Sequence, residues 1–112
     1  GLQGHARKAA QATGLKLHEG VYVWFSGPQF ETPAEVRFAH LIGGTAAGMS
    51  TVPEVILARQ AGMKVAGFSI ITNLGAGMSD APLSHEHTMK IAAEAAGQLR
   101  RLLNRMIADW AL

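Results

Sequence analysis

Two kinds of hydrophobic pattern alternate along the chain. Runs rich in β-branched and aromatic residues occupy positions 20–27 and 64–72, and such runs are typical of strands buried on both faces. A run of small residues at 45–50 predicts one more strand. The segments between them carry helix signals and predict helices over residues 4–13, 32–42, 51–61 and 84–110.

Local signals mark where these helices begin and end. Thr32 and Thr51 each open a T-x-x-E pattern that contains a proline, which predicts a side-chain cap at both helix starts. Gly14 and Gly62 follow two of the predicted helix ends. Residues 73–84 are rich in Gly, Asp and Pro and predict a loop. The last helix has an apolar stripe formed by Ile91, Ala95, Leu99, Leu102, Met106 and Trp110.

The alternation of strands and helices predicts an α/β fold, with a parallel or mixed sheet flanked by helices. Residues 1–112 are expected to belong to a single domain, because no linker or internal boundary interrupts the pattern. Three strands are few for such a sheet, and both outer strands would be apolar edges. We therefore expect the sheet to be incomplete and the chain to be part of a larger unit.

The composition excludes several classes of function. The chain has no cysteine, which excludes a disulfide scaffold and thiolate chemistry and fits a cytoplasmic location. The formal charge is only +2, and the arginines at 100–105 fit the solvent face of a helix, so we expect no nucleic-acid partner. No run approaches about 18 apolar residues, so we expect no membrane partner.

Glu31 is the residue that local structure does not explain. It lies just before the Thr32 cap, whereas Glu35 occupies the position of a capping glutamate. Parallel strands end at a common edge, and ligands of open α/β sheets bind there. This edge would bring Glu31 together with Asn73 and with the hydroxyl of Ser50.

The side chains at this edge match a flat heterocycle. A carboxylate accepts hydrogen bonds, and an amide both accepts and donates them. A 6-oxopurine offers N1–H and a 2-amino group to Glu31, and it offers O6 and N7 to Asn73. Adenine would present an acceptor to the carboxylate and leave it unpaired. Spacing alone does not single out a purine, because any polar ring fits this chemistry.

Structural roles stay open for each of these residues. Solvation before a helix would explain Glu31, and a left-handed loop conformation would explain Asn73. His85 and His87 are two positions apart in a helix and do not share a face, so we predict no metal site. Core packing or helix capping would explain Phe30, Tyr22, Met49, Ser50 and Thr51.

Three longer motifs carry a family resemblance. They are GPQFETPAEVR at 27–37, AAGMSTVPEVILARQAGMKVAGFSIITN at 46–73 and LSHEH at 83–87. From Gly20 to the last helix, the chain resembles the C-terminal part of the trimeric, 6-oxopurine class of purine nucleoside phosphorylases. This resemblance implies a mixed sheet with surrounding helices. It also implies phosphate-dependent cleavage of inosine- and guanosine-type nucleosides to a free base and ribose 1-phosphate.

The resemblance implies a role for each matched residue. Asn73 would bind N7 and O6, Glu31 would bind N1 and the 2-amino group, and His85 would reach the 5′-hydroxyl. The loop before His85 is shorter than in vertebrate members, which leaves His87 as the alternative. No metal or organic cofactor is implied, since inorganic phosphate is the co-substrate. Base and ribose contacts would come from Phe30, Tyr22, Ala47, Met49 and Thr72, and a phosphate contact from Ser50.

The family chain is much longer than the matched segment. Its glycine-rich phosphate loop, its phosphate-clamping histidine and arginine, and an aromatic residue donated by the neighbouring subunit all precede that segment. Residues 1–19 contain no counterpart of them. We therefore expect the chain alone to be inactive, to need the missing N-terminal half as a partner, and to form a homotrimer when complete.

Two alternatives stay open. A 5′-methylthioadenosine phosphorylase is a related 6-aminopurine enzyme, but such enzymes tend to carry aspartate where Asn73 stands. A non-catalytic fragment or oligomerisation piece would keep the fold and lack the phosphate site.

Overall fold

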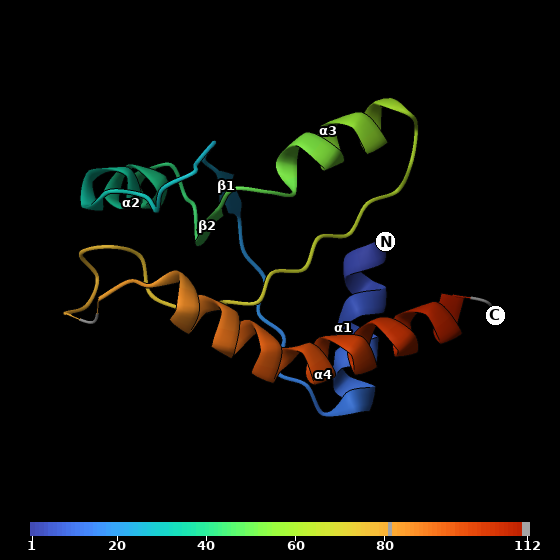
Figure 1. The fold of residues 1–112 in the computed structure, drawn as a ribbon. Coiled ribbons are helices and arrows are strands. Elements are labelled where there is room, and N and C mark those ends of the chain that lie inside the picture. The colour runs from blue at the N-terminus through green and yellow to red at the C-terminus, as the bar shows by residue number, and fades with distance from the viewer. Residues whose placement is uncertain (81, 111–112) are drawn as a thin grey trace.

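The computed structural model describes residues 1–80 and 82–110 (Figure 1). Within them, four helices accompany a small parallel sheet, which confirms the predicted α/β class. The helix ends lie within two residues of the predicted ones, and position 81 of the predicted loop lies outside the described residues. In chain order the elements are α1 (Leu2–Thr13), β1 (Tyr22–Trp24), α2 (Pro33–Leu41), β2 (Ala46–Gly48), α3 (Val52–Gln60) and α4 (His85–Trp110).

The best-packed part of the molecule is the crossing of α1 and α4. The alanine-rich face of α1 lets the two helices approach closely, and α1 ends at Gly14, which has φ +67° and closes the last turn. Of the stripe predicted for α4, Leu102 and Met106 are buried in this core and Leu99 packs against it, whereas Trp110 is exposed and meets His5 edge-on. The buried residues of the crossing are Ala6, Ala9, Ala10, Leu102 and Met106.

Strands β1 and β2 pair in parallel, with Tyr22 opposite Ala46 and Trp24 opposite Gly48. Each strand has three residues and is shorter than the run that predicted it. Helix α2 connects them, and Gly43, with φ +89°, turns the chain from α2 toward β2. Helices α2 and α3 lie on opposite sides of the two strands (Figure 1). This arrangement places the carboxyl ends of both strands at one edge.

The strand predicted at 64–72 does not form, and that prediction is wrong. The segment is extended, but no backbone hydrogen bond joins it to another described residue. Phe68 and Ile70 are half-buried while Ser69 and Ile71 are exposed, so the side chains alternate as they do in a strand. A strand also needs a neighbour for its backbone groups, and the described residues supply none here.

The molecule is more open than a compact domain of this length. Its radius of gyration is 15.4 Å, against about 13 Å for a compact domain. The strand predicted at 20–27 is not buried on both faces as expected, because Val21 is 56% and Trp24, in β1, is 44% exposed. Phe38 and Leu41 of α2 and Leu57 of α3 are also exposed. These surfaces lack the cover that their sequence pattern predicts.

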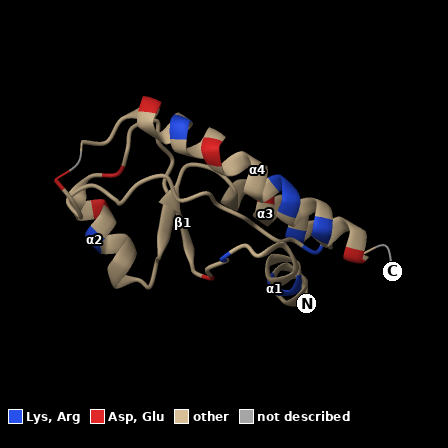
Figure 2. Ribbon diagram, turned by 90° about the horizontal axis from the view of Figure 1, so that it is seen from below, with Lys and Arg blue, Asp and Glu red and all other residues tan. Residues whose placement is uncertain are grey.

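Charged residues are unevenly distributed, with the basic ones concentrated on α1 and the C-terminal half of α4 (Figure 2). Strand β1 and its carboxyl end lie within residues 17–36, and β2 and its carboxyl end lie within residues 38–58. Neither of these two ranges contains a lysine or an arginine. The strand ends therefore carry no cationic side chain of their own.

Over residues 1–80 and 82–110, no helix is both long enough and apolar enough to cross a membrane.

Candidate functional site

The two glutamates at the start of α2 differ in their surroundings, and Glu35 is the capping one. The Thr32 amide donates to the Glu35 carboxylate at 2.7 Å, and the Glu35 amide donates to the Thr32 hydroxyl oxygen at 3.3 Å. The bond from the Thr32 amide, and then that from its hydroxyl, lower the pKa of Glu35 below its usual value. The stability this gives is present above the unfolded-state pKa and is lost as the pH falls through the folded-state pKa. The predicted capping box is confirmed.

Glu31 has no such structural role. Its carboxylate oxygen Oε1 is buried and has no hydrogen-bond partner. Among the side-chain nitrogen and oxygen atoms that the structure describes, it is the single one in this condition. A buried oxygen without a partner costs about 1–3 kcal/mol, and more when it is charged. The fold therefore keeps an unfilled acceptor beyond the carboxyl end of β1.

Close contacts gather three predicted residues at the strand ends. The Ser50 amide donates to the Tyr22 hydroxyl oxygen at 3.3 Å. The Tyr22 ring lies against Gly48, where a Cβ atom would collide with it. Met49 packs on Gly27 in a similar way, since a Cβ atom there would lie 2.6 Å from the Met49 sulfur. Sequence reasoning did not predict that these glycines permit the approach, although small residues beside strand ends are a signal for it.

The cap predicted at Thr51 is wrong. Thr51 has φ +75° and ψ −54°, and its side chain makes no capping bond. Instead, the Val52 amide donates to the Ser50 carbonyl at 2.8 Å and closes a γ-turn centred on Thr51. The Thr51 hydroxyl lies 3.1 Å from that of Ser50. A β-branched residue is strained at positive φ, so this turn stores strain beside the candidate phosphate contact.

We expect Thr51→Gly to raise the free energy of unfolding by about 1 kcal/mol. Relief of strain contributes about 1–3 kcal/mol, and the chain entropy of glycine offsets about 0.5–1 kcal/mol of it. Denaturant unfolding of the parent and the variant measures the change. Thr13→Gly makes the same exchange in the helical backbone of α1 and should destabilise the protein. A loss of stability in both variants would contradict the assignment of strain to Thr51.

Thr72 and Asn73 end the extended segment, and hydrogen bonds fix the Asn73 amide. The Thr72 hydroxyl donates to Asn73 Oδ1 at 2.7 Å, and Asn73 Nδ2 donates to the Leu74 carbonyl at 2.9 Å. Thr72 and Asn73 are both half-buried. One N–H of the amide therefore remains for a further acceptor.

The loop after Asn73 packs against the start of α2. A Cβ atom on Gly75 would lie 2.9 Å from Val36, and one on Gly77 would lie 3.0 Å from Pro33. Since α2 begins two residues after Glu31, the segments that carry Glu31 and Asn73 meet at its first turns. The roles of both residues in binding stay predictions.

Three other predicted residues are less closely tied to this group. Phe30 and Ala47 are exposed, and Ala47 pairs with Val23 in the sheet. His85 is exposed in the first turn of α4, which Ser84 caps by accepting from the His87 amide at 3.1 Å. No hydrogen bond links His85 to the strand ends within the part of the chain that the structure describes. That part also contains no group of three or more His, Cys, Asp or Glu side chains that could hold a metal ion.

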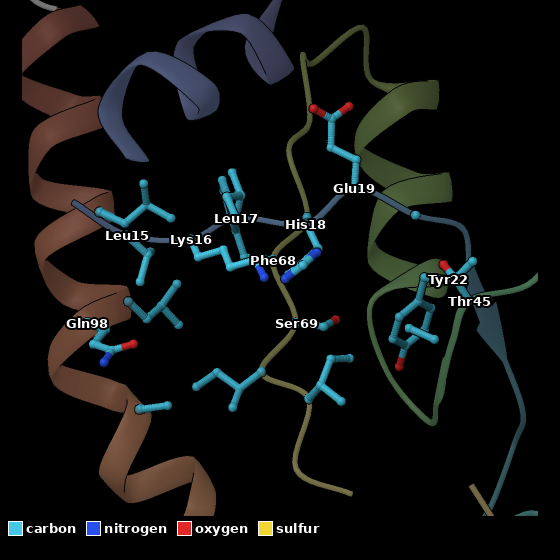
Figure 3. Close-up of a pocket in the computed structure, with 18 of the residues that line it drawn as sticks. Leu15, Lys16, Leu17, His18, Glu19, Tyr22, Thr45, Phe68, Ser69 and Gln98 are labelled. Carbon is cyan, nitrogen blue, oxygen red and sulfur yellow. The ribbon is translucent and has the colours of Figure 1, made fainter. Parts of the chain in front are cut away.

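A cavity of about 550 Å³ lies between α4, residues 15–21 and the extended residues 67–71 (Figure 3). Tyr22 and Thr51 reach its lining, whereas Glu31 and Asn73 do not. Residues 16–20 and 67–71 make no backbone hydrogen bonds to other backbone groups that the structure describes. The cavity is therefore a space beside two unpaired extended segments. Sequence reasoning missed it, although the alternation of leucine with polar residues over 15–18 was a signal.

Residues 1–108 match the phosphorylase superfamily. The chain belongs to this family. The matched span includes every candidate residue considered above, from Tyr22 to His85.

Curated phosphorylases similar to this chain are considerably longer. Purine nucleoside phosphorylase 1 of Geobacillus stearothermophilus is 44% identical over 106 residues, which are 95% of this chain and 39% of that protein. Purine nucleoside phosphorylase 1 of Bacillus subtilis (strain 168) is 43% identical over 109 residues, which are 97% of this chain and 40% of that protein. The chain thus spans about two-fifths of the length of these curated relatives.

A solved phosphorylase structure shares the fold. The crystal structure of Schistosoma mansoni purine nucleoside phosphorylase in complex with inosine matches with a TM-score of 0.89 at 34% identity. The match covers 95% of this chain and 39% of the Schistosoma chain. The described residues therefore have the fold of one part of a phosphorylase, and the predicted family is confirmed.

Proposed function

We propose that this chain is the base- and ribose-binding part of a purine nucleoside phosphorylase. The reaction is phosphate-dependent cleavage of the N-glycosidic bond of inosine- and guanosine-type nucleosides. The unfilled acceptor of Glu31 carries the proposal, because a 6-oxopurine supplies an N1–H donor that the described fold does not, and guanine adds a 2-amino donor. The names of the two bacterial relatives support the same reaction.

Asn73 is the proposed donor to the leaving base. The C1′–N9 bond breaks, a bond forms between C1′ and a phosphate oxygen, and negative charge accumulates on the purine. One N–H of Asn73 is held by the Leu74 carbonyl, and the other is available to N7. A donor aimed at charge that develops during the reaction stabilises the transition state more than the ground state.

The remaining contacts are assigned by position. Tyr22 and Met49 would contact the ribose and Ser50 the phosphate, and the hydrogen bond between Tyr22 and Ser50 supports their common placement. Phe30 and Ala47 would line the base pocket, and His85 would reach the 5′-hydroxyl. Inorganic phosphate is the proposed co-substrate, and no metal or organic cofactor is part of the proposal.

The phosphate clamp is proposed to come from the N-terminal half that the longer relatives carry. The strand ends have no lysine or arginine between positions 17 and 36 or between 38 and 58, and a phosphate dianion needs such donors. The cavity beside residues 16–20 and 67–71 is where that half would complete the sheet. The complete enzyme is proposed to be a cytoplasmic homotrimer that returns free purine bases for reuse.

Release of hypoxanthine from inosine tests the proposal. The whole protein that carries residues 1–112 and the isolated segment are each assayed with and without inorganic phosphate. We expect release from the whole protein only, and only with phosphate. Turnover of 5′-methylthioadenosine in place of inosine would favour that relative, and no turnover of any of these nucleosides by the whole protein would overturn the proposal.

A further inference from the structure

The Asn73 amide is held in one orientation by two neighbours. The Leu74 carbonyl can only accept, so it accepts a hydrogen bond from Nδ2 at 2.9 Å. Asn73 Oδ1 can also only accept, so the Thr72 hydroxyl donates a hydrogen bond to Oδ1 at 2.7 Å. The hydroxyl therefore occupies one lone pair of Oδ1, and the free group that the amide presents is mainly an N–H donor.

The position of this amide is fixed as well as its orientation. The loop that follows is packed against α2, where Gly75 leaves no room for a Cβ atom beside Val36. Because α2 starts directly after Glu31 and Thr32, the amide is anchored to the helix that follows the Glu31 carboxylate. A change at Thr72 would therefore alter the hydrogen bonding of Asn73 without releasing the loop.

We infer that Thr72 is a positioning residue that sets the preference of the site for 6-oxopurines over 6-aminopurines. The inference rests on the proposed function of Asn73 as the amide that binds the base. N7 and O6 of a 6-oxopurine are both acceptors and suit the free N–H of Asn73. A 6-amino group is a donor, and it would have to share Asn73 Oδ1 with the Thr72 hydroxyl, which already donates to one of its two lone pairs.

In this role Thr72 does not contact the base itself and instead holds Asn73, the residue that does. Without the hydroxyl, both lone pairs of Asn73 Oδ1 would be free and a half-buried acceptor would lack a donor. A 6-amino group could then satisfy it, whereas the base of inosine, which carries no proton on N7 or O6, could not. Thr72 thus acts on specificity through Asn73.

Thr72→Val in the whole protein tests the inference, because valine keeps the branched shape and removes only the hydroxyl. We expect kcat/KM for inosine to fall about fivefold to tenfold, since one hydrogen bond to Asn73 is lost. For adenosine, kcat/KM should stay constant or rise, so kcat/KM for inosine divided by kcat/KM for adenosine should fall. Thr72→Ser retains the hydroxyl and should keep that ratio within about twofold of the parent.

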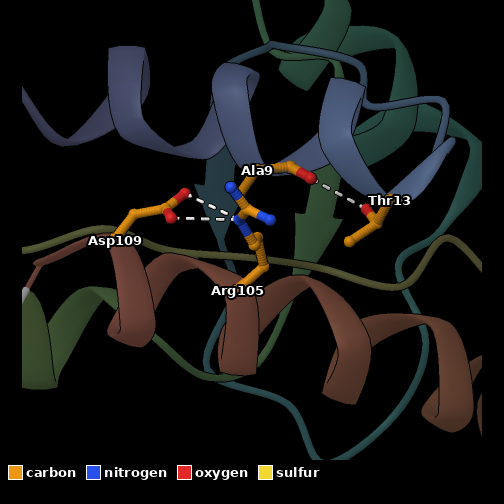
Figure 4. Close-up of polar contacts among 4 residues, drawn as sticks. All are labelled: Ala9, Thr13, Arg105 and Asp109. Atoms are coloured by element: carbon orange, nitrogen blue, oxygen red, sulfur yellow. Dashed lines mark hydrogen bonds and ion pairs between the residues drawn. The ribbon is translucent and has the colours of Figure 1, made fainter.

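Thr13→Val is the matched control. Thr13 is half-buried on α1, and its hydroxyl donates to the Ala9 carbonyl at 2.9 Å (Figure 4). The exchange removes the same group from a position outside the site, beside the α1–α4 crossing. We expect it to leave the ratio of inosine to adenosine unchanged even if the protein loses some stability.

The outcomes separate this inference from the proposed function. A parent protein without phosphate-dependent turnover of inosine would remove the proposed function and the inference with it. If the parent is active, the inference alone would be overturned by either of two results. One is that Thr72→Val leaves the inosine-to-adenosine ratio of kcat/KM unchanged, and the other is that Thr72→Ser changes that ratio by much more than twofold. If Thr72→Val does not fold, Thr72→Ala replaces it, and equilibrium binding of inosine and adenosine without phosphate gives the ratio of the two affinities without turnover.

Discussion

Glu31→Gln in the whole protein is expected to lower kcat/KM for inosine about tenfold to a hundredfold, because one mispaired polar contact costs about 1–3 kcal/mol. The loss for guanosine should be larger, since its 2-amino group gives Glu31 a second donor. A glutamine either turns a donor toward N1–H or accepts without the help of a charge. Steady-state kinetics with the two nucleosides measures both effects.

Glu35→Gln is the control for this prediction. It makes the same chemical change at the capping position, and glutamine also closes a capping box, so turnover should stay within about twofold. Glu31→Gln should unfold at no lower temperature than the parent, because Glu31 Oε1 has no partner to lose. If Glu31→Gln kept the turnover of the parent, or lowered the unfolding temperature without lowering turnover, Glu31 would be a structural residue before α2.

The helices could be predicted because their signals are local. The capping box of Thr32 and Glu35 lies within four residues, and the closing glycine of α1 directly follows that helix. Both signals act within one helical turn and do not depend on the rest of the fold. The parallel pairing of β1 and β2 followed from the helix between them, which requires a crossover.

The extended segment at 64–72 shows what local pattern leaves out. Its alternation of half-buried and exposed side chains is that of a strand, yet strand formation needs a neighbour from elsewhere in the molecule. Thr51 shows the same limit on a smaller scale. The T-x-x-E pattern predicts a cap, but the backbone takes a γ-turn that the pattern does not encode.

The candidate site was predictable in its members and less so in its geometry. Glu31 could be singled out because the capping role was already filled by Glu35, and the structure leaves its oxygen without a partner. The bond between Thr72 and Asn73 could not be predicted, since adjacency in sequence does not fix side-chain orientation. The contacts that gather Tyr22 and Ser50 depend on a glycine that sequence reasoning treated as part of a strand.

Asn73→Ala is expected to reduce kcat for inosine about a hundredfold to a thousandfold, the scale seen when one donor to a developing negative charge is removed. The reason is that the Asn73 N–H would meet N7 as the purine gathers charge, so its loss falls on the transition state. KM should change little, because the same bond is weaker to the neutral nucleoside. Single-turnover and steady-state kinetics of the whole protein separate the two constants.

Asn104→Ala is the matched control, since Asn104 is exposed on α4 and should tolerate the same exchange without loss of turnover. Asn73→Asp gives a second test of the role. An aspartate that is ionised accepts from a 6-amino group and repels O6, so the ratio of inosine to adenosine turnover should fall. A rise in KM at constant kcat in Asn73→Ala would instead assign Asn73 to ground-state binding, and an unchanged kcat/KM would remove it from the site.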